Sequence, residues 1–359
     1  MTSMRVAVVM PPVVSMDHAA VLELWPTFTG QLEALRATQQ VDVVGYCRTT
    51  ADAGVVKRNG VDYYFENSNA RLAKRVFDQH PRVVHVHGLG FTRLLLAIRR
   101  AVGSVGGRRV ALVMQHHGEP PPQLLRSRLA QRATRTMVDG YLFTGADGQA
   151  APFRRSGSIS RSATVFELLE SASDLGGTVP IAHPALSGSP SVLWVGRLIP
   201  SKDPLCAVRS IASARSLGSD AELHMVATDR SLEDEVLRLI DASQLHDAVH
   251  IHPPVAHADM AGWYAATDIY LSTSHREGSN YSLIEALGFG CVPVVTEIPS
   301  HAAIVKDLSR RFPVGDAGAC GALIATPNKT SRSEIVSYAE RCLSWETIAG
   351  QLVEIYRQL

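Results

Sequence analysis

The sequence has 359 residues, of which 46% are hydrophobic and 19% are charged. This length favours two domains of ordinary size, and the composition supplies enough apolar residues for buried cores while arguing against a disordered chain. The formal net charge is +1 at pH 7, so the overall charge gives no reason to expect a nucleic-acid-binding protein.

The first half of the chain predicts a doubly wound, mostly parallel sheet. Short apolar runs that are typical of buried strands occur at residues 5–10, 41–46, 83–86, 110–114 and 140–143. Residues 20–37 and 69–79 have apolar positions at three- and four-residue spacing, which predicts helices between the strands. Strands and helices that alternate in this way indicate an α/β fold.

The second half repeats this plan after a segment that is rich in turn-forming residues. Glycine, proline and serine are concentrated at residues 176–190, and we place the domain boundary there, between residues 180 and 181. Strands are predicted at residues 191–195, 222–227, 248–252, 269–272 and 292–296, and helices at residues 204–216, 232–242, 258–266 and 282–288. An amphipathic pattern predicts a last helix over residues 344–359.

The cysteines and the N-terminus indicate a cytoplasmic protein. Cys47, Cys206, Cys291, Cys320 and Cys342 are scattered and form no Cys-x-x-Cys pair. Free thiols in a reducing compartment fit this pattern better than disulfides or a zinc site. The first apolar run is too short for a secretory signal, and no stretch approaches the ~20 apolar residues that a membrane span needs. We therefore expect a cytoplasmic chain without a transmembrane segment.

Two glutamates, Glu277 and Glu285, bracket the start of the helix that follows the predicted strand at residues 269–272. In open α/β sheets, ligands bind at the carboxyl ends of strands, and a helix that begins there presents N–H groups to a phosphate. The residues at this helix start are Asn280, Tyr281, Ser282 and Leu283. They would hold a diphosphate, while Glu285 accepts hydrogen bonds from ribose and Glu277 lies nearer the group attached to the diphosphate. Surface charges and a helix cap are the simpler explanation of two glutamates taken alone.

A glycine, an arginine and a lysine follow the first predicted strand of the second half. Gly196 comes directly after this strand, Arg197 follows it, and Lys202 precedes the next helix. Glycine permits close approach of the backbone, arginine binds phosphate oxygens as a fork, and lysine adds a point charge. The two cations would neutralise a diphosphate leaving group without a metal, and the sequence has no Asp-x-Asp tripeptide to hold Mg²⁺. An ordinary strand-to-helix turn with two surface cations is the alternative.

These two runs, in this order, resemble the donor-binding domain of family 4 retaining glycosyltransferases, which have the GT-B fold. The resemblance rests on the Val-Gly-Arg-Leu…Lys run at residues 195–202 and the Glu-x7-Glu run at residues 277–285. It covers the second half closely and the first half loosely. It implies two Rossmann-like doubly wound domains facing an interdomain cleft, with an acceptor domain over residues 1–180 and a donor domain over residues 181–344. The resemblance also implies that residues 345–359 cross back to complete the first domain.

Two His-Gly sites in the first half lie at predicted strand ends. The first contains His85 and His87; structural partners explain both most simply, and His87 is kept as an acceptor-side candidate. The second contains His116 and His117. The resemblance implies a histidine near the reacting sugar at this second site, which we assign to His117, with His116 as the rival. Glu170 is a weaker candidate at a further strand end.

The loop after the first strand departs from the family pattern. Many members have a glycine pair there, whereas this chain has no glycine before Gly30. We therefore expect the acceptor side to be built differently, with Asp17 and His18 as candidates for contacts with acceptor hydroxyls. The run at residues 279–281 also lacks the glycine or proline that is common at this point of the family.

The resemblance implies a retaining glycosyltransferase that moves a sugar from a UDP-, GDP- or other nucleotide-diphosphate sugar to an acceptor. The proposed catalytic residues are His117, Arg197, Lys202 and Glu277, and no metal or cofactor is expected beyond the donor. A GT-B epimerase or phosphorylase and a non-catalytic sugar-nucleotide-binding subunit are the alternatives. A hydride-transferring enzyme is disfavoured because no Gly-x-Gly-x-x-Gly follows the first strand of either half. The acceptor, which is a glycan, a lipid carrier or a small natural product, and the oligomeric state stay open.

Basic residues gather in two stretches of the first half. They are Arg93, Arg99, Arg100, Arg108 and Arg109, followed by Arg126, Arg128, Arg132 and Arg135. A solvated surface explains such clusters most simply. An anionic acceptor and peripheral contact with an acidic membrane surface are the sharper alternatives.

Overall fold

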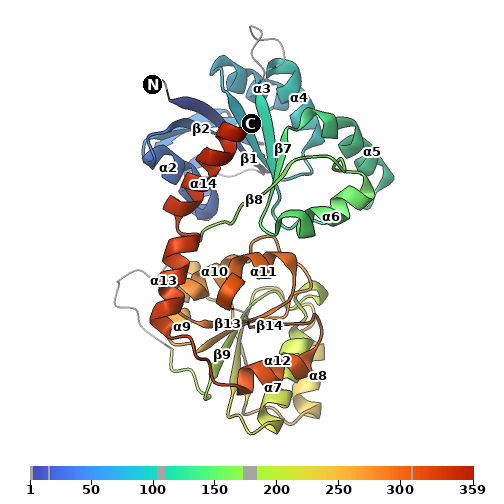
Figure 1. Cartoon of the computed structure of the whole chain (residues 1–359), viewed down its shortest axis with the longest axis vertical. Coiled ribbons are helices and arrows are strands. Elements are labelled where there is room, and N and C mark those ends of the chain that lie inside the picture. Colours follow the sequence, from blue (N-terminus) through green and yellow to red (C-terminus); the bar gives the residue numbers. More distant parts are fainter. Residues whose placement is uncertain (1–2, 15–16, 103–109, 173–183, 309) are drawn as a thin grey trace. The chain divides into compact units, whose positions relative to one another are not determined.

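The computed structural model of the chain describes residues 3–14, 17–102, 110–172, 184–308 and 310–359. The chain divides into two compact units: Met1–Ser173 together with Trp345–Leu359, and Asp174–Ser344 (Figure 1). The predicted boundary between residues 180 and 181 lies outside the described residues, as do Arg108 and Arg109. Each unit contains one sheet of mainly parallel strands, so the predicted α/β class with two doubly wound domains is confirmed.

The first unit contains an eight-stranded sheet with the order β3-β4-β2-β1-β5-β6-β7-β8. Its strands are β1 Met4–Val13, β2 Val41–Thr49, β3 Gly54–Arg58, β4 Val61–Glu66, β5 Val83–His87, β6 Ala111–Gln115, β7 Gly140–Phe143 and β8 Val165–Glu167. All neighbours pair in parallel except β3 and β4. The central strands β5 and β6 are buried along their whole length, as expected for parallel strands with helices on both faces.

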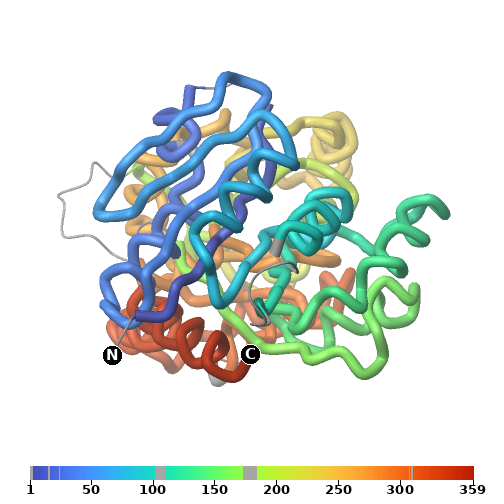
Figure 2. The backbone as a smooth tube through the Cα atoms, turned by 90° about the horizontal axis from the view of Figure 1, so that it is seen from above, coloured from blue at the N-terminus to red at the C-terminus, as the bar shows by residue number. Residues whose placement is uncertain are grey.

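Helices cover both faces of this sheet. They are α1 His18–Leu24, α2 Pro26–Ala37, α3 Asn69–Asp78, α4 Thr92–Val102, α5 Leu125–Thr134, α6 Ala146–Ser156 and α14 Trp345–Gln358, with the 3-10 turn η1 Arg135–Met137. Apolar residues of α3, α4 and α6 pack on one face in a common core. Helix α14, from the far end of the chain, packs beside α2 on the other face (Figures 1 and 2). There the hydroxyl of Tyr356 lies 2.7 Å from Nδ1 of His85.

Two features of the first unit differ from the sequence prediction. The antiparallel pair β3–β4 was not predicted, because β3 alternates half-buried and exposed residues and has no apolar run. Its signal is the turn Asn59-Gly60, where both residues have positive φ, at 46° and 78°, as in the type I′ hairpins that Asn-Gly favours. The predicted helix over residues 20–37 is divided into α1 and α2 at Pro26, which begins α2.

The second unit contains a six-stranded sheet, entirely parallel, with the order β11-β10-β9-β12-β13-β14. Its strands are β9 Ser191–Gly196, β10 Glu222–Ala227, β11 Val249–His252, β12 Ile269–Ser272, β13 Val292–Thr296 and β14 Arg311–Phe312. Its helices are α7 Pro204–Ser216, α8 Glu233–Ala242, α9 Met260–Ala265, α10 Tyr281–Gly288, α11 Pro299–Val305, α12 Ala317–Ala325 and α13 Arg332–Leu343, with the turns η2 Pro200–Lys202, η3 His257–Asp259 and η4 Lys306–Leu308. Across both units, none of the described helices combines the length and apolar character that crossing a membrane requires.

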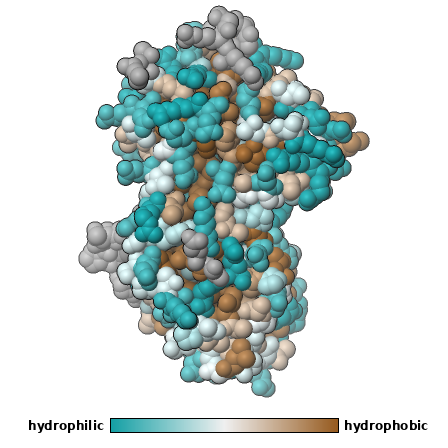
Figure 3. All heavy atoms as spheres, viewed as in Figure 1, coloured by the Kyte–Doolittle hydropathy of each residue, from teal (hydrophilic) through white to brown (hydrophobic). Residues whose placement is uncertain are grey.

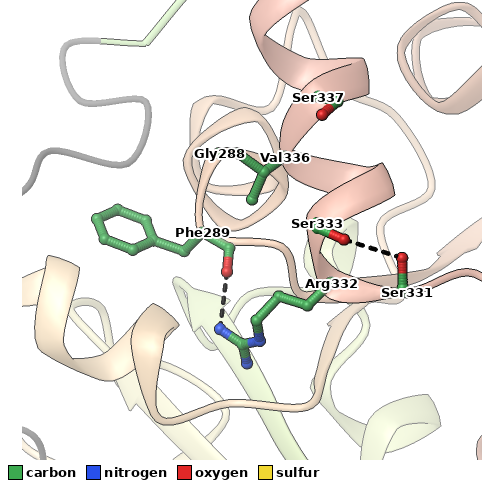
Figure 4. Close-up of a pocket in the computed structure, with 7 residues that line it drawn as sticks. All are labelled: Gly288, Phe289, Ser331, Arg332, Ser333, Val336 and Ser337. Atoms are coloured by element: carbon green, nitrogen blue, oxygen red, sulfur yellow. Dashed lines mark hydrogen bonds between the residues drawn. The ribbon is translucent and has the colours of Figure 1, made fainter.

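Arg332, the first residue of α13, closes the ends of two neighbouring helices. Its guanidinium donates to the carbonyl oxygens of Ala265 at 3.2 Å and Phe289 at 2.7 Å, and also to that of Thr267. These carbonyls lie at the ends of α9 and α10, where backbone acceptors lack partners within the helix. Figure 4 shows the guanidinium of this arginine turned toward the carbonyl oxygen of Phe289, in a pocket that Val336 also lines. Because its donors serve the helix ends, we interpret the pocket as a structural junction.

We expect Gly290→Ala to destabilise the second unit by about 2 kcal/mol or more, because left-handed backbone costs an L-residue roughly 1–2 kcal/mol before any clash. Gly290 has a φ of +77°, and a Cβ there would lie 2.7 Å from the carbonyl oxygen of Arg332 and closer still to its Cγ. Urea unfolding would measure the loss. Gly350→Ala is the matched control, because this helical glycine faces open space and alanine should stabilise it by up to about 1 kcal/mol. Equal stability of Gly290→Ala and the wild type would contradict this description.

Candidate functional site

The loops that follow β9 and β12 are joined at the carboxyl edge of the second sheet. The indole Nε1 of Trp194 donates to Oγ1 of Thr273 at 3.1 Å. This hydroxyl oxygen lies 2.8 Å from the carbonyl oxygens of both Lys202 and Asp203. The backbone around Lys202 is therefore fixed against the loop that carries Glu277.

Lys202 and Glu277 form an ion pair at this junction. The ammonium group of Lys202 donates to Oε1 of Glu277, which also accepts from Oγ of Ser274 at 2.6 Å. The two side chains are 20% and 11% exposed, so the pair is shielded but still accessible to a ligand. Arg197, directly after Gly196 at the end of β9, is exposed, and its side chain forms no hydrogen bond or ion pair with any residue that the structure describes.

Asn280 caps helix α10 at the same edge. It has a left-handed backbone conformation with a φ of 51°, and its Oδ1 accepts from the N–H of Leu283 at 3.4 Å. Its Nδ2 donates to Nε2 of His301 at 2.9 Å. The helix begins at Tyr281, one residue before the predicted start at Ser282. Since the cap already accepts from Leu283, the N–H of that residue is engaged within the protein.

His301, which was not predicted from the sequence, is fully buried behind this helix start. Its Nδ1 donates to the carbonyl oxygen of Thr296 at 2.9 Å, which leaves Nε2 to accept from Asn280. Burial lowers the pKa of His301 to about 4, although the charge of Glu277 opposes this shift. The ring is therefore neutral at physiological pH, in the form that can accept a hydrogen bond. His301 positions Asn280 and, through it, the start of α10.

Glu285 lies in the second turn of α10 and is buried. Its Oε1 lies 2.8 Å from Nε2 of His257, and its Oε2 accepts from the hydroxyl of Tyr264 at 2.8 Å. Tyr264 is buried, whereas the side chain of His257 is 55% exposed. The carboxylate is thus fixed on its inner side, faces a solvent-exposed residue on its outer side, and retains lone pairs for a further donor.

In the first unit, His87, His117 and Glu170 form a buried polar chain. Nδ1 of His87, at the end of β5, lies 2.8 Å from Nε2 of His117, which follows β6. Nδ1 of His117 lies 3.2 Å from Oε1 of Glu170, and the amide of Gln115 donates to the same oxygen. The ring of Phe28 meets both histidines edge-on, with centroids 4.8 and 5.4 Å away. Glu170 has only a weak signal in the sequence, but in the structure it is the anionic end of this polar chain.

The two histidines carry opposite pKa shifts. Burial, with the nearby charges of His85 and His117, lowers the pKa of His87 well below its ordinary value. Burial alone would also lower the pKa of His117, but Glu170 and, to a smaller extent, Glu119 outweigh it and raise that pKa. His117 is therefore the member that holds a proton, and neutral His87 accepts its hydrogen bond. Nε2 of His87 is buried and has no hydrogen-bond partner within the described residues.

His116 lies outside this polar chain. Its ring stacks on Phe143 with centroids 4.8 Å apart, and burial lowers its pKa. The neighbouring carboxylate of Glu119 accepts from the backbone N–H groups of Leu89 at 2.5 Å and His117 at 2.8 Å. Glu119 therefore joins the loops after β5 and β6. Of the two candidate histidines, the geometry places His117 in the polar chain and His116 in an aromatic core.

Asp17 and His18 have local structural partners. Oδ1 of Asp17 accepts from the N–H of Ala19 at 2.7 Å and so caps helix α1. The ring of His18 stacks on Phe65 of β4, with centroids 4.2 Å apart. Their contact with acceptor hydroxyls stays a prediction.

Residues 189–330 match the model of a family described as Glycosyl transferases group 1. This stretch contains Arg197, Lys202, Asn280 and both glutamates of the predicted donor site. The second unit is similar to the group 1 glycosyl transferases over most of its length. The resemblance that its two motifs predicted is thereby confirmed.

Two relatives of this chain are D-inositol 3-phosphate glycosyltransferases. That of Arthrobacter sp. (strain FB24) is 29% identical over 124 residues, which cover 34% of this chain and 30% of that protein. That of Xylanimonas cellulosilytica is 26% identical over 181 residues, which cover 47% of this chain and 42% of the relative. The matched stretch thus spans less than half the length of either relative.

The likeness to solved structures shows that the chain has the GT-B fold. A glycosyltransferase from Rickettsia africae aligns with a TM-score of 0.71 at 15% identity, over 100% of this chain and 99% of that one. The E. coli trehalose-6-phosphate protein bound with UDP-2-fluoro glucose aligns with a TM-score of 0.69 at 12% identity, over 99% of each chain. The lipopolysaccharide outer core galactosyltransferase WaaB gives 0.68 at 14% identity, over 99% of this chain and 100% of that one.

We expect Glu170→Gln to lower the pKa of His117. Burial lowers this pKa, and in the variant only the negative charge of Glu119 remains to raise it. NMR titration of the imidazole signals would measure it, with Glu354→Gln on the exposed surface of α14 as control. In the wild type, the raised pKa stabilises the fold fully below the ordinary histidine pKa of about 6.5, and this contribution is lost as pH rises through the folded-state pKa. As pH rises through that range, the stability of Glu170→Gln should fall less than that of the wild type. An unchanged pKa of His117 would contradict the assignment of Glu170.

Proposed function

We propose that this chain is a retaining glycosyltransferase that transfers a sugar from a nucleotide-diphosphate sugar to an acceptor without a catalytic metal. The observation that carries the proposal is the Lys202–Glu277 pair beside the exposed Arg197, at the carboxyl edge of a group 1 glycosyl transferase sheet. A donor sugar nucleotide requires cations for its diphosphate and hydrogen-bond acceptors for its sugar hydroxyls. The site offers both within a single junction of loops.

The leaving diphosphate would be stabilised by Arg197 and Lys202. The guanidinium of Arg197 forms no hydrogen bond or ion pair within the described residues, so it can bind phosphate oxygens as a fork. Lys202 is held in place by Glu277, and a bound phosphate would share its ammonium donors. Fixed cations at a developing negative charge are a large source of transition-state stabilisation. They supply the role that a divalent metal has in other transferases.

Glu277 and Glu285 would hold the two ends of the donor. Glu277 is held in place by Lys202 and Ser274, and its carboxylate oxygens are hydrogen-bond acceptors, which suits a sugar hydroxyl. Glu285 would accept from ribose hydroxyls at its outer oxygen, with the half-exposed His257 turning aside. The buried bond from Tyr264 would keep the carboxylate in place. The E. coli structure bound with UDP-2-fluoro glucose supports a UDP-sugar as the first donor to test.

The acceptor side would lie in the first unit, around His117 and the nearby polar pocket. His117 holds its proton through Glu170, so it can donate to the sugar or acceptor. A pocket in the same unit is lined by residues that include Arg93, Glu119 and Arg126. Its two arginines favour an anionic acceptor. The phosphate in the name of the Arthrobacter and Xylanimonas relatives is consistent with that chemistry.

We expect Arg197→Ala to weaken donor-nucleotide binding at least about tenfold, because a charge-assisted bond contributes roughly 1.5–3 kcal/mol. Calorimetry with UDP, GDP, ADP and dTDP would identify the nucleotide and measure the loss. Lys202→Ala should lower turnover more strongly than Arg197→Ala does, because it also leaves the Glu277 carboxylate without its cation. Arg238→Ala, an exposed arginine on α8, is the matched control and should bind like the wild type.

The same experiment separates the alternatives. Transfer or slow hydrolysis of the donor, with the anomeric configuration retained by NMR and undiminished in EDTA, would support the proposal. Nucleotide binding without any turnover would favour the non-catalytic subunit. Phosphate-dependent cleavage or sugar epimerisation would favour the phosphorylase or epimerase. Equal nucleotide affinity in Arg197→Ala and the wild type would remove the proposed donor site.

Peripheral membrane contact is part of the proposal and rests on helix α5. Leu125 and Leu129 are 69% and 55% exposed and lie one turn apart, so they share a face of this helix. Exposed arginines at positions 126, 128 and 132 flank them, and the helix has no acidic residue. Figure 3 shows a hydrophobic patch bordered by hydrophilic residues over this part of the molecule. Exposed leucines among arginines suit an anionic lipid surface.

Sedimentation with vesicles would test this surface. We expect the protein to pellet with vesicles that contain an anionic phospholipid and to stay in solution with neutral ones. Replacing Leu125 and Leu129 by serine should reduce binding several-fold, because each loses about 1.5–3 kcal/mol of apolar burial at most. Leu217→Ser, which removes an exposed leucine of the second unit, should have no effect. Equal binding to neutral and anionic vesicles would contradict the charge argument.

A cytoplasmic location completes the proposal. All five cysteines are free thiols, and four of them are buried. Burial raises the pKa of these four thiols, to about 12 for Cys47, for example, so they are not reactive. Free thiols of this kind suit a reducing compartment.

A further inference from the structure

A row of three histidines and a glutamate lies on one face of the edge strand β11 and its neighbour β10. Glu222 and His224 alternate along β10, and His250 and His252 alternate along β11, so each pair lies on a single face. The two strands are parallel, and His224 is directly opposite His250, which brings both pairs to the same face. The alternate residues, such as Leu223, face the opposite way into the core.

The side chains of Glu222, His224 and His250 converge. One possible ligand atom from each lies within 4.8 Å of those of the other two, which makes this the sole such group of histidine, cysteine or acidic residues that we find in the described part of the chain. Nε2 of His250 lies 2.8 Å from Oε2 of Glu222. The rings of His224 and His250 are stacked with centroids 4.8 Å apart.

We propose that Glu222, His224 and His250 bind a divalent transition-metal ion, with zinc as the best fit. Two imidazoles and a carboxylate are a common nitrogen and oxygen ligand set for zinc, which takes four ligands in a tetrahedral arrangement. The fourth position would be filled by water or by His252, whose Nε2 lies 3.2 Å from Nδ1 of His224. The oxygen-preferring ions Mg²⁺ and Ca²⁺ fit this set poorly.

The surrounding structure holds the three residues in place. Gly188 has a φ of +98°, and a Cβ there would lie 2.6 Å from the backbone nitrogen of Glu222, so only glycine lets the preceding loop come this close. This loop places the carbonyl oxygen of Ser187 3.0 Å from Nε2 of His224, and its hydroxyl donates to Glu222. Hydrogen bonds of this kind orient metal ligands in proteins.

The exposure of these residues gives an ion access to the site. The side chains of Glu222 and His250 are 20% and 33% exposed, so an ion can enter from solvent.

The position of the site separates it from the proposed chemistry. Glu222 and His224 lie in the amino half of β10, whereas Arg197, Lys202 and Glu277 follow the carboxyl ends of parallel strands in the same sheet. The metal site and the proposed donor site therefore lie toward opposite ends of the strands. An ion bound here would stabilise the fold and would take no part in sugar transfer. It would link β11, which is the edge strand, to β10 and so stabilise that edge.

Calorimetric titration of the EDTA-treated full chain with ZnCl₂ would test the proposal, with elemental analysis for stoichiometry. We expect one equivalent to bind and to raise the apparent melting temperature. His250→Gln and Glu222→Gln should each weaken binding by more than the ~10–100-fold that is typical of losing a supporting residue. His246→Gln is the matched control, because this exposed histidine of the same unit pairs only with Asp241 among the described residues and should not alter binding.

Two results would overturn the proposal. One is the absence of stoichiometric binding by the wild type at micromolar ZnCl₂. The other is an unchanged affinity in both His250→Gln and Glu222→Gln. Circular dichroism of each metal-free variant would establish that it is folded, and Glu222→Gln, which changes a partly exposed side chain by one atom, serves if His250→Gln does not fold. Neither readout depends on the donor or on turnover, so failure here leaves the proposed transferase activity standing.

Discussion

Parallel pairing of strands is the constraint on which both candidate sites depend. Because parallel strands all leave the sheet at the same edge, residues far apart in the sequence meet there without any loop needing to be long. Lys202 follows β9 and Glu277 follows β12, and these strands are neighbours in the sheet. His87 and His117 come together by the same rule after β5 and β6. The chemistry of each unit is thus a consequence of strand order.

Burial then decides which of the gathered groups carry charge. His87 and His301 are buried without a dominant acidic partner, and both have lowered pKa values. The side chain of His117 is 19% exposed and contacts Glu170, and its pKa moves the other way. A donor and an acceptor of hydrogen bonds are thereby produced from the same residue type. Environments that separate pKa values in this way are a common basis for assigning distinct roles in a site.

Strands and site residues whose signal lies in a short stretch of sequence could be predicted. Those whose role depends on tertiary contacts could not. Apolar runs located most of the parallel strands, and two short motifs located Arg197, Lys202 and the glutamates. The hairpin β3–β4 was missed because its signal is confined to Asn59-Gly60. His301 carries no pattern of its own, and its role exists only because α11 packs behind the start of α10. The role of Glu170 likewise depends on its short distance from His117, which the sequence does not reveal.

The return of α14 to the first sheet has a consequence for synthesis on the ribosome. Residues 174–344 form one continuous unit, inserted between the two segments that make up the other. The inserted unit can therefore fold while the first still lacks its last helix. Until residues 345–358 emerge, the face of α2 and the ring of His85 have no cover from Trp345 and Tyr356. The unit that is made first is thus the one completed last, and its open face would need protection from aggregation in the interval.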